Sequence, residues 1–224
     1  MRIEVLYRPA HSLAKVGLSA GESVVAESGA LVGMSTNVRM QTSSGGVVGG
    51  LKRMFGGESF FRNTFTAEGS DGEVLLAHAL CGDMVALEMT PQGYYLQSSA
   101  FVASTAGVDV QTRIGGLKSL FAGEGLFLLQ ATSRGAGSLL VGAFGGVEEI
   151  AVDGHLAIDT GHLVAWDGNL QWSVGRSGAG WVASWLSGEG LVCRFEGRGR
   201  VWIQTRNPAA YGREVGRLLP PRKE

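Results

Sequence analysis

The feature that most constrains this 224-residue chain is a block that occurs three times. "GGLKRMFGGESFFRNTFTAEG" begins at Gly49, "GGLKSLFAGEGLFLLQATSRG" begins at Gly115, and a looser copy, "GAGWVASWLSGEGLVCRFEGRG", begins at Gly178. Each copy has a Gly-Glu pair followed by an apolar strand, and successive pairs, at 57, 123 and 188, lie 66 and 65 residues apart. Such regular self-similarity indicates a repeated structural unit. The residues that mark the repeats, to which we assign a structural role, are Gly57, Glu58, Gly123, Glu124, Gly188 and Glu189.

The residues around these blocks have the periodicity of β-strands. "LVGMSTNVRMQT", "FVASTAGVDVQT" and "LVAWDGNLQWS" each predict two short strands about a tight turn, at which Asn37, Gly107 or Asn169 supplies the positive backbone angle. Helical signals are few, and the clearest is "NPAAYGREVGRLL", where Asn207 is suited to cap and Pro208 to occupy the first turn. We therefore expect an all-β fold with a short C-terminal helix.

The predicted domain organisation follows from the repeats. We expect three tandem units of β-sandwich or double-stranded β-helix type with pseudo-threefold order, at about residues 1–80, 81–145 and 146–206. Residues 207–224 form the helix and a basic tail. Because no Ser/Pro/charge-rich linker separates the units, residues 1–224 are expected to form a single compact body.

Composition bears on assembly and location. Hydrophobic residues make up 45% of the chain and charged residues 17%, which favours a homo-oligomer with subunit-covered surface. Cys81 and Cys193 have no CxxC or metal-type spacing, so we expect two reduced, buried thiols. The N-terminus lacks an apolar signal core, and the longest uncharged interval, residues 89–108, is too polar to span a bilayer. These features predict a cytoplasmic protein.

Nucleotide-binding motifs are incomplete. Residues 45–50 begin like a phosphate-binding loop, but Leu51 stands where the lysine is needed, and no βαβ alternation surrounds it. "GAGWVA" at Gly178 resembles a dinucleotide fingerprint but lacks the helix that should follow. We assign no cofactor.

Catalytic and metal-binding constellations are also missing from the pattern. The four histidines have no metal-ligand spacing. Ser28, Ser98 and Thr160 recur at matching positions, which a shared turn hydrogen bond explains better than three catalytic sites. The repeated Gly-Glu carboxylates have a structural interpretation at loop corners, with an axial cation site as the alternative. We assign no catalytic residue and no metal, and we expect a protein that is not an enzyme.

The first block differs from the others in its glycine run and basic pair. It predicts an interaction loop, for which a subunit contact is favoured over an anionic membrane surface. The residues of this loop are Gly49, Gly50, Lys52, Arg53 and Phe55.

With its Gly-Glu echoes and the late "GRGRVWIQTR", the "GGLKRMFGGESFF" block resembles a family named for a mitochondrial biogenesis protein altered in mitochondrial inheritance, formerly a domain of unknown function. The resemblance covers about residues 2–206. It implies a fold similar to the trp RNA-binding attenuation protein and ring-like oligomers, of which a trimer is expected. It brings no established catalytic residue.

Three functional hypotheses remain. The leading one is a non-catalytic oligomeric binding or scaffold protein whose partner is itself, with a protein or membrane surface as a further partner. An RNA-binding protein by fold analogy is the first alternative, against which the net charge of −1 argues, and nucleic acid is not expected as a partner. A small-molecule-binding protein or enzyme with a pocket in one β unit is the second.

Overall fold

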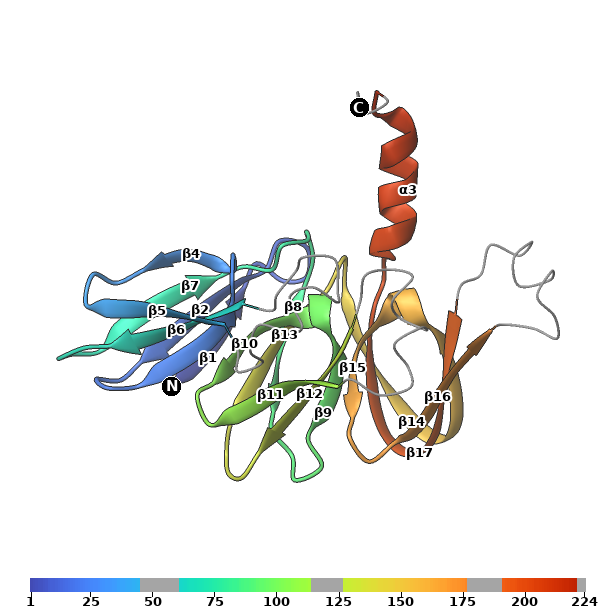
Figure 1. Ribbon diagram of the computed structural model, residues 1–224, viewed down its shortest axis with the longest axis horizontal. Coiled ribbons are helices and arrows are strands. Elements are labelled where there is room, and N and C mark those ends of the chain that lie inside the picture. The colour runs from blue at the N-terminus through green and yellow to red at the C-terminus, as the bar shows by residue number, and fades with distance from the viewer. Residues whose placement is uncertain (45–60, 114–126, 177–190, 221–224) are drawn as a thin grey trace.

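The computed structural model describes residues 1–44, 61–113, 127–176 and 191–220. In these residues the chain is nearly all β, with one α-helix, which confirms the predicted all-β fold with a short C-terminal helix (Figure 1). The strands are β1 (Arg2–Leu6), β2 (Leu13–Leu18), β3 (Ser23–Glu27), β4 (Leu31–Met34), β5 (Val38–Ser44), β6 (Phe61–Ala67), β7 (Gly72–Leu76), β8 (Met84–Glu88), β9 (Tyr94–Gln97), β10 (Phe101–Thr105), β11 (Val108–Arg113), β12 (Leu128–Ser133), β13 (Ser138–Gly142), β14 (Val147–Asp159), β15 (Leu163–Asp167), β16 (Gln171–Arg176) and β17 (Leu191–Gln204).

The strands form three antiparallel sheets. A four-stranded sheet has the order β1-β2-β7-β4, and a six-stranded sheet has the order β5-β6-β3-β10-β13-β8. The seven-stranded sheet runs β11-β12-β9-β15-β17-β14, with β16 also paired to β17. Alternating apolar side chains, such as Val24 and Ala26 on β3, point into the core between the sheets and are fully buried.

One pairing order recurs along the chain. β4 pairs with β7, β10 with β13 and β15 with β17, and each of these pairs has a register shift two residues into the first strand, between 31 and 33, 101 and 103, or 163 and 165.

The predicted tight hairpins are wrong: within the described residues β4 does not pair with β5, β10 with β11 or β15 with β16, and Asn37, Gly107 and Asn169 do not have the expected positive φ. The chain turns away after β4 and β10, since β5 and β11 lie in other sheets, and β16 pairs beyond β15 on the long strand β17. The strands after these turns pair instead as β5 with β6, β11 with β12 and β16 with β17. The arrangement in three tandem units and the boundaries of these units stay a prediction.

The strands fall into three consecutive groups, β1–β7, β8–β13 and β14–β17, and neighbouring groups are joined by strand pairing. β3 pairs with β10, where Ala26 faces Ala103, and β9 pairs with β15, where Leu96 faces Ala165. The groups consequently follow one another along the long axis of the molecule (Figure 1). In the described residues the buried apolar side chains form three clusters. The side chains of Trp166 and Trp202 are among the largest that are fully buried.

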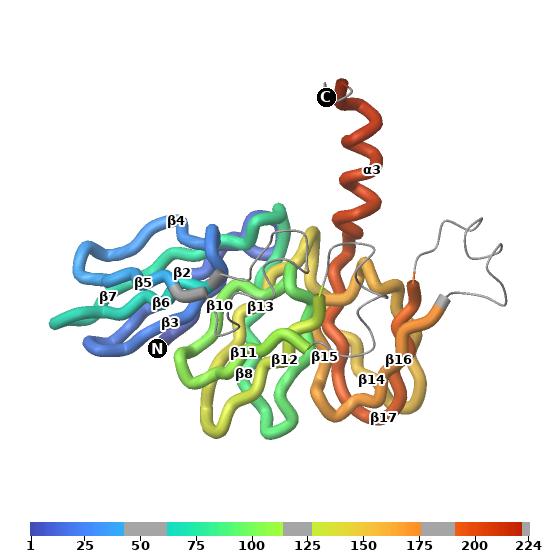
Figure 2. Tube along the Cα trace, viewed as in Figure 1, coloured from blue at the N-terminus to red at the C-terminus, as the bar shows by residue number. Residues whose placement is uncertain are grey.

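The helix α3 (Pro208–Leu218) begins where the sequence predicts. The Asn207 side chain accepts a hydrogen bond from the Ala210 N–H at 3.1 Å, and Pro208 follows the cap. The helix projects away from the strands (Figures 1 and 2), and no residue in it is buried. Its first turn is held by Tyr211, whose ring lies edge-on to Phe144 with centroids 5.1 Å apart.

The two thiols differ from the expectation. Cys193 is buried on β17 as predicted, but Cys81 is exposed, so the prediction of two buried thiols is wrong for Cys81. Cys81 lies in the connection between β7 and β8, where its carbonyl accepts a hydrogen bond from the Gly145 N–H. Its backbone therefore fixes the segment while its side chain faces outward.

Candidate interaction surfaces

The residues that the sequence singled out lie in three connections beyond the described parts of the chain. The predicted interaction loop, Gly49, Gly50, Lys52, Arg53 and Phe55, falls in residues 45–60, together with Gly57 and Glu58. The other repeat-marking pairs fall in residues 114–126 and 177–190; they are Gly123, Glu124, Gly188 and Glu189. The structure describes only the paired strand ends that flank each connection, where residue 44 faces 61, 113 faces 128 and 176 faces 191. The assignments to these residues therefore stay predictions.

The recurrent hydroxyl positions take part in turns. The Ser98 hydroxyl accepts a weak hydrogen bond from the Phe127 N–H at 3.4 Å, and the carbonyl of Thr160 accepts one from the buried Gln97 side chain. Beside Thr160, the Asp159 carboxylate accepts a hydrogen bond from the Gly161 N–H at 2.8 Å. Of these contacts only the one at Ser98 uses the hydroxyl, and its partner Phe127 is 29 residues away. The shared turn hydrogen bond of the three hydroxyls therefore stays a prediction.

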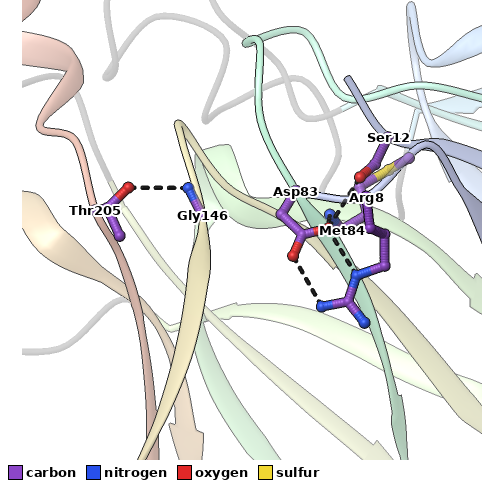
Figure 3. Close-up of polar contacts among 6 residues, drawn as sticks. All are labelled: Arg8, Ser12, Asp83, Met84, Gly146 and Thr205. Atoms are coloured by element: carbon purple, nitrogen blue, oxygen red, sulfur yellow. Dashed lines mark hydrogen bonds and ion pairs between the residues drawn. The ribbon is translucent and has the colours of Figure 1, made fainter. Parts of the chain in front are cut away.

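A buried carboxylate that the sequence did not reveal lies between the first two strand groups. Asp83 is 2% exposed and accepts two hydrogen bonds from the Arg8 guanidinium, both at 2.8 Å (Figure 3). The Ser12 hydroxyl and the Met84 N–H donate to it as well, at 2.9 and 2.8 Å. Burial alone would raise the pKa of Asp83, but the hydrogen bonds from Arg8, Ser12 and Met84 outweigh burial and leave the pKa below its ordinary value.

This cluster explains a turn that composition could not predict. Arg8 lies before Pro9 in the connection between β1 and β2, and the Ser12 N–H donates to the Gly82 carbonyl at 3.0 Å. Arg8 and Asp83 are 75 residues apart, so no local pattern links them. The Asp83 carboxylate already accepts hydrogen bonds from Arg8, Ser12 and Met84. It therefore joins the β1–β2 connection to the start of β8 and is not a free base.

A second tie closes the other side of this region (Figure 3). The Thr205 hydroxyl accepts a hydrogen bond from the Gly146 N–H at 2.9 Å, and the Thr205 N–H donates to the Gly146 carbonyl at 3.0 Å. The Gln204 side chain also accepts from the Phe144 N–H at 2.9 Å. These contacts fix the segment that enters β14 against the end of β17.

A further buried acid lies in the seven-stranded sheet. Asp167 is 7% exposed and accepts hydrogen bonds from the backbone N–H of Arg200 at 2.8 Å and from its guanidinium at 3.1 Å. The guanidinium carbon lies 4.8 Å from the ring centre of Trp202, a cation–π distance. The hydrogen bond to Asp167 raises the pKa of Arg200, so the guanidinium stays charged and holds β15 against β17.

Reactive and metal-binding groups are scarce in the described parts of the chain. Burial raises the pKa of the Cys193 thiol to about 12, which leaves little thiolate at neutral pH. Among residues 1–44, 61–113, 127–176 and 191–220, no three His, Cys, Asp or Glu side chains gather as a metal would require. The one described α-helix is not long and apolar enough to cross a membrane.

Exposed large apolar side chains include Tyr7 before β2 and Tyr211 on α3, and two further groups of them lie on a strand and at a helix end. The first, which we call the β4 edge, carries Val32 and Met34 of β4, which are 58% and 41% exposed. The second is the far end of α3, where Leu218 and Leu219 are exposed. An outer strand also presents unpaired backbone groups, so the β4 edge combines two properties of a contact surface.

Comparison with known proteins finds one matching family model and similar proteins from Streptococcus pyogenes. A family model described as mitochondrial biogenesis AIM24 matches residues 3–206. An uncharacterized protein of Streptococcus pyogenes serotype M6 is 32% identical over 219 residues, which cover 93% of this chain and 87% of the relative. The crystal structure of a Streptococcus pyogenes protein superposes with a TM-score of 0.81 at 29% identity, covering 97% of this chain and 99% of the other.

Proposed function

Since the chain belongs to the mitochondrial biogenesis AIM24 family, whose model matches nearly all of it, we propose that it is a non-catalytic binding or scaffold protein that assembles with copies of itself. The observation that carries the proposal is the β4 edge, where an outer strand exposes Val32 and Met34. A lone soluble chain gains nothing from apolar side chains on an unpaired strand, because both features promote association. A second copy of the chain satisfies both.

The buried ionisable groups support the non-catalytic part of the proposal. Asp83 and Asp167 are each saturated by an arginine and by backbone or hydroxyl donors. A general base needs a lone pair available to substrate, and a nucleophile needs a base within hydrogen-bond reach. The described carboxylates that are buried are instead used to hold strands together.

The oligomeric mass tests this proposal. We expect light scattering of the full chain at micromolar concentration to give a multiple of 23.5 kDa, with three times that mass as the expected stoichiometry. Adding single-stranded RNA at low salt should leave the mass unchanged, because the net charge of −1 provides no concentrated positive surface for phosphates. A mass of 23.5 kDa at every concentration up to about 50 µM would contradict self-assembly.

A further inference from the structure

Two outer strand edges, one on β4 and one on β14, could pair with each other between two copies of the chain. Within the described residues, β4 pairs only with β7, and the C-terminal half of β14 pairs only with β17. β4 and β14 lie toward opposite ends of the long axis (Figure 1), so they do not pair within one chain. Each edge presents a row of backbone groups to solvent.

The corresponding edges inside the chain pair with each other. The sequences "AESGALVGM", "LQSSAFVAS" and "IDTGHLVAW" align Ala26 with Leu96 and Ile158. They also align residues 33, 103 and 165. The structure places residue 26 opposite 103, where β3 pairs with β10, and residue 96 opposite 165, where β9 pairs with β15. In both cases a residue of the first aligned position pairs with a residue of the second aligned position in the next repeat. Two aligned residues have no such partner in the described chain: residue 158 of β14 and residue 33 of β4.

Burial at matching positions shows what each edge is missing. Val102 and Val164 lie on strands that are covered by a neighbour, and both are 0% exposed. Val32 occupies the same position on β4 and is 58% exposed. At the position two residues later, Trp166 is 0% exposed but Met34 is 41% exposed. The β4 edge therefore carries core-type side chains where no neighbour covers them.

The opposite edge shows the same contrast. Ala26 of β3 and Leu96 of β9 are fully buried where they meet the next strand group. Ile158 of β14 takes the matching position and is only half-buried, and its neighbour Ala157 is exposed. Both edges thus carry apolar residues that could pair in an antiparallel sheet, and in the described parts of the chain neither edge has the neighbouring strand that its internal counterparts have.

We propose that β4 of one copy pairs antiparallel with residues 156–159 of β14 in a second copy, with Gly33 opposite Ile158 and Met34 opposite Ala157. This inference rests on the proposed self-assembly and deepens it by naming the contact. Because the two edges are different surfaces, the contact is head-to-tail, which generates a ring when the rotation closes. Val32 then becomes buried as Val102 and Val164 are.

The neighbouring strand β5 provides a matched control. β5 is also an outer strand, but its counterparts β11 and β16 pair only with β12 and β17 in the described residues. The series therefore predicts no partner for β5. Met40 of β5 is 44% exposed, close to the 41% of Met34, so it is a methionine of equal exposure outside the proposed contact.

Disulfide trapping between copies tests the contact. Met34→Cys and Ala157→Cys are placed in separate chains, each with Cys81→Ser, and the two chains are co-expressed and oxidised. We expect a covalent dimer on non-reducing gels, because directly opposed residues in an antiparallel pair have Cβ atoms about 4.5–5.5 Å apart. Pairing Met40→Cys with Ala157→Cys should give none. Both positions are exposed, so the fold is expected to be unchanged, and circular dichroism checks this.

Oligomeric mass separates this inference from the proposed function. Val32→Lys should reduce the assembly to 23.5 kDa at a concentration where wild type and Met40→Lys both keep the oligomeric mass. If wild type is oligomeric, but Val32→Lys leaves its mass unchanged and no cross-link forms, the β4–β14 contact is wrong and self-assembly stands on another surface. If wild type is itself a monomer, both are overturned.

Discussion

Replacing Gly82 with alanine is expected to lower the free energy of unfolding by about 3 kcal/mol or more. The added Cβ would lie 2.1 Å from the Ala143 carbonyl oxygen and 2.6 Å from the N and O atoms of Gly145. These are backbone atoms held by hydrogen bonds. The Ala143 N–H donates to the backbone carbonyl of Asp83 at 3.0 Å, and the Asp83 N–H donates to the carbonyl of Gly145 at 2.7 Å. The clash can be relieved only by breaking this ladder. Urea denaturation followed by tryptophan fluorescence measures the loss.

Gly107→Ala is the matched control for this prediction. A Cβ at Gly107 would meet nothing within 4 Å, and its backbone is not in the left-handed region. The free energy of unfolding should therefore change by no more than about 0.5 kcal/mol. Equal unfolding midpoints for Gly82→Ala and Gly107→Ala would contradict the close approach of the two turns at Gly82 and Gly145.

Asp83→Asn is expected to cost about 2–3 kcal/mol at neutral pH. The change removes the charge that pairs with Arg8, and it leaves the Ser12 and Met84 donors with a weaker acceptor. The lower part of the range for broken buried pairs applies because the Arg8 side chain is half-exposed and regains water. Urea midpoints of wild type and variant measure this cost.

The cost should fall in acid. The folded-state pKa of Asp83 lies below its ordinary value, so in the acid range the unfolded chain binds more protons at this position than the folded one. The stabilisation by ionised Asp83 is therefore complete above the unfolded pKa, about 3.9, and disappears as pH falls through the folded pKa. The difference between wild type and Asp83→Asn should shrink between about pH 5 and pH 3.

An exposed ion pair controls for general acid effects. Asp153 accepts from Arg198 at 2.8 Å, but both side chains are largely exposed. Asp153→Asn should change stability by less than about 1 kcal/mol at any of these pH values. A cost of Asp83→Asn that stays constant down to pH 3 would show that the carboxylate is not held ionised by its donors.

The sequence predicted the local features of the fold. The sequence "LVGMSTNVRMQT" predicts two strands, and β4 and β5 form there, although they do not pair with each other. Asn207 with Pro208 specifies the start of α3, because such signals depend on neighbours in the chain. The recurring pairings of β4, β10 and β15 also follow repeated sequence. The tie between Arg8 and Asp83 joins distant segments, and its residues have no repeat or spacing that would predict it.

The candidate site was predicted less well than the fold. The predicted interaction residues lie in connections beyond the described residues. The β4 edge was identified instead from the exposure of its side chains, and no sequence motif marks it. Val32, Val102 and Val164 occupy the same position in the sequence pattern. Their exposures differ because exposure depends on the next strand in the sheet, which only the three-dimensional arrangement provides.

Hydrogen exchange of the wild-type assembly tests head-to-tail pairing most directly. The backbone amides of β4 and of residues 156–159 should be protected as strongly as those of β10 and β15, while the outer strand β5 exchanges faster. Val32→Lys should remove the protection from both edges at once and leave β5 unchanged. Exchange of the β4 amides at the rate of β5 in an oligomeric wild-type sample would contradict the pairing of β4 with β14.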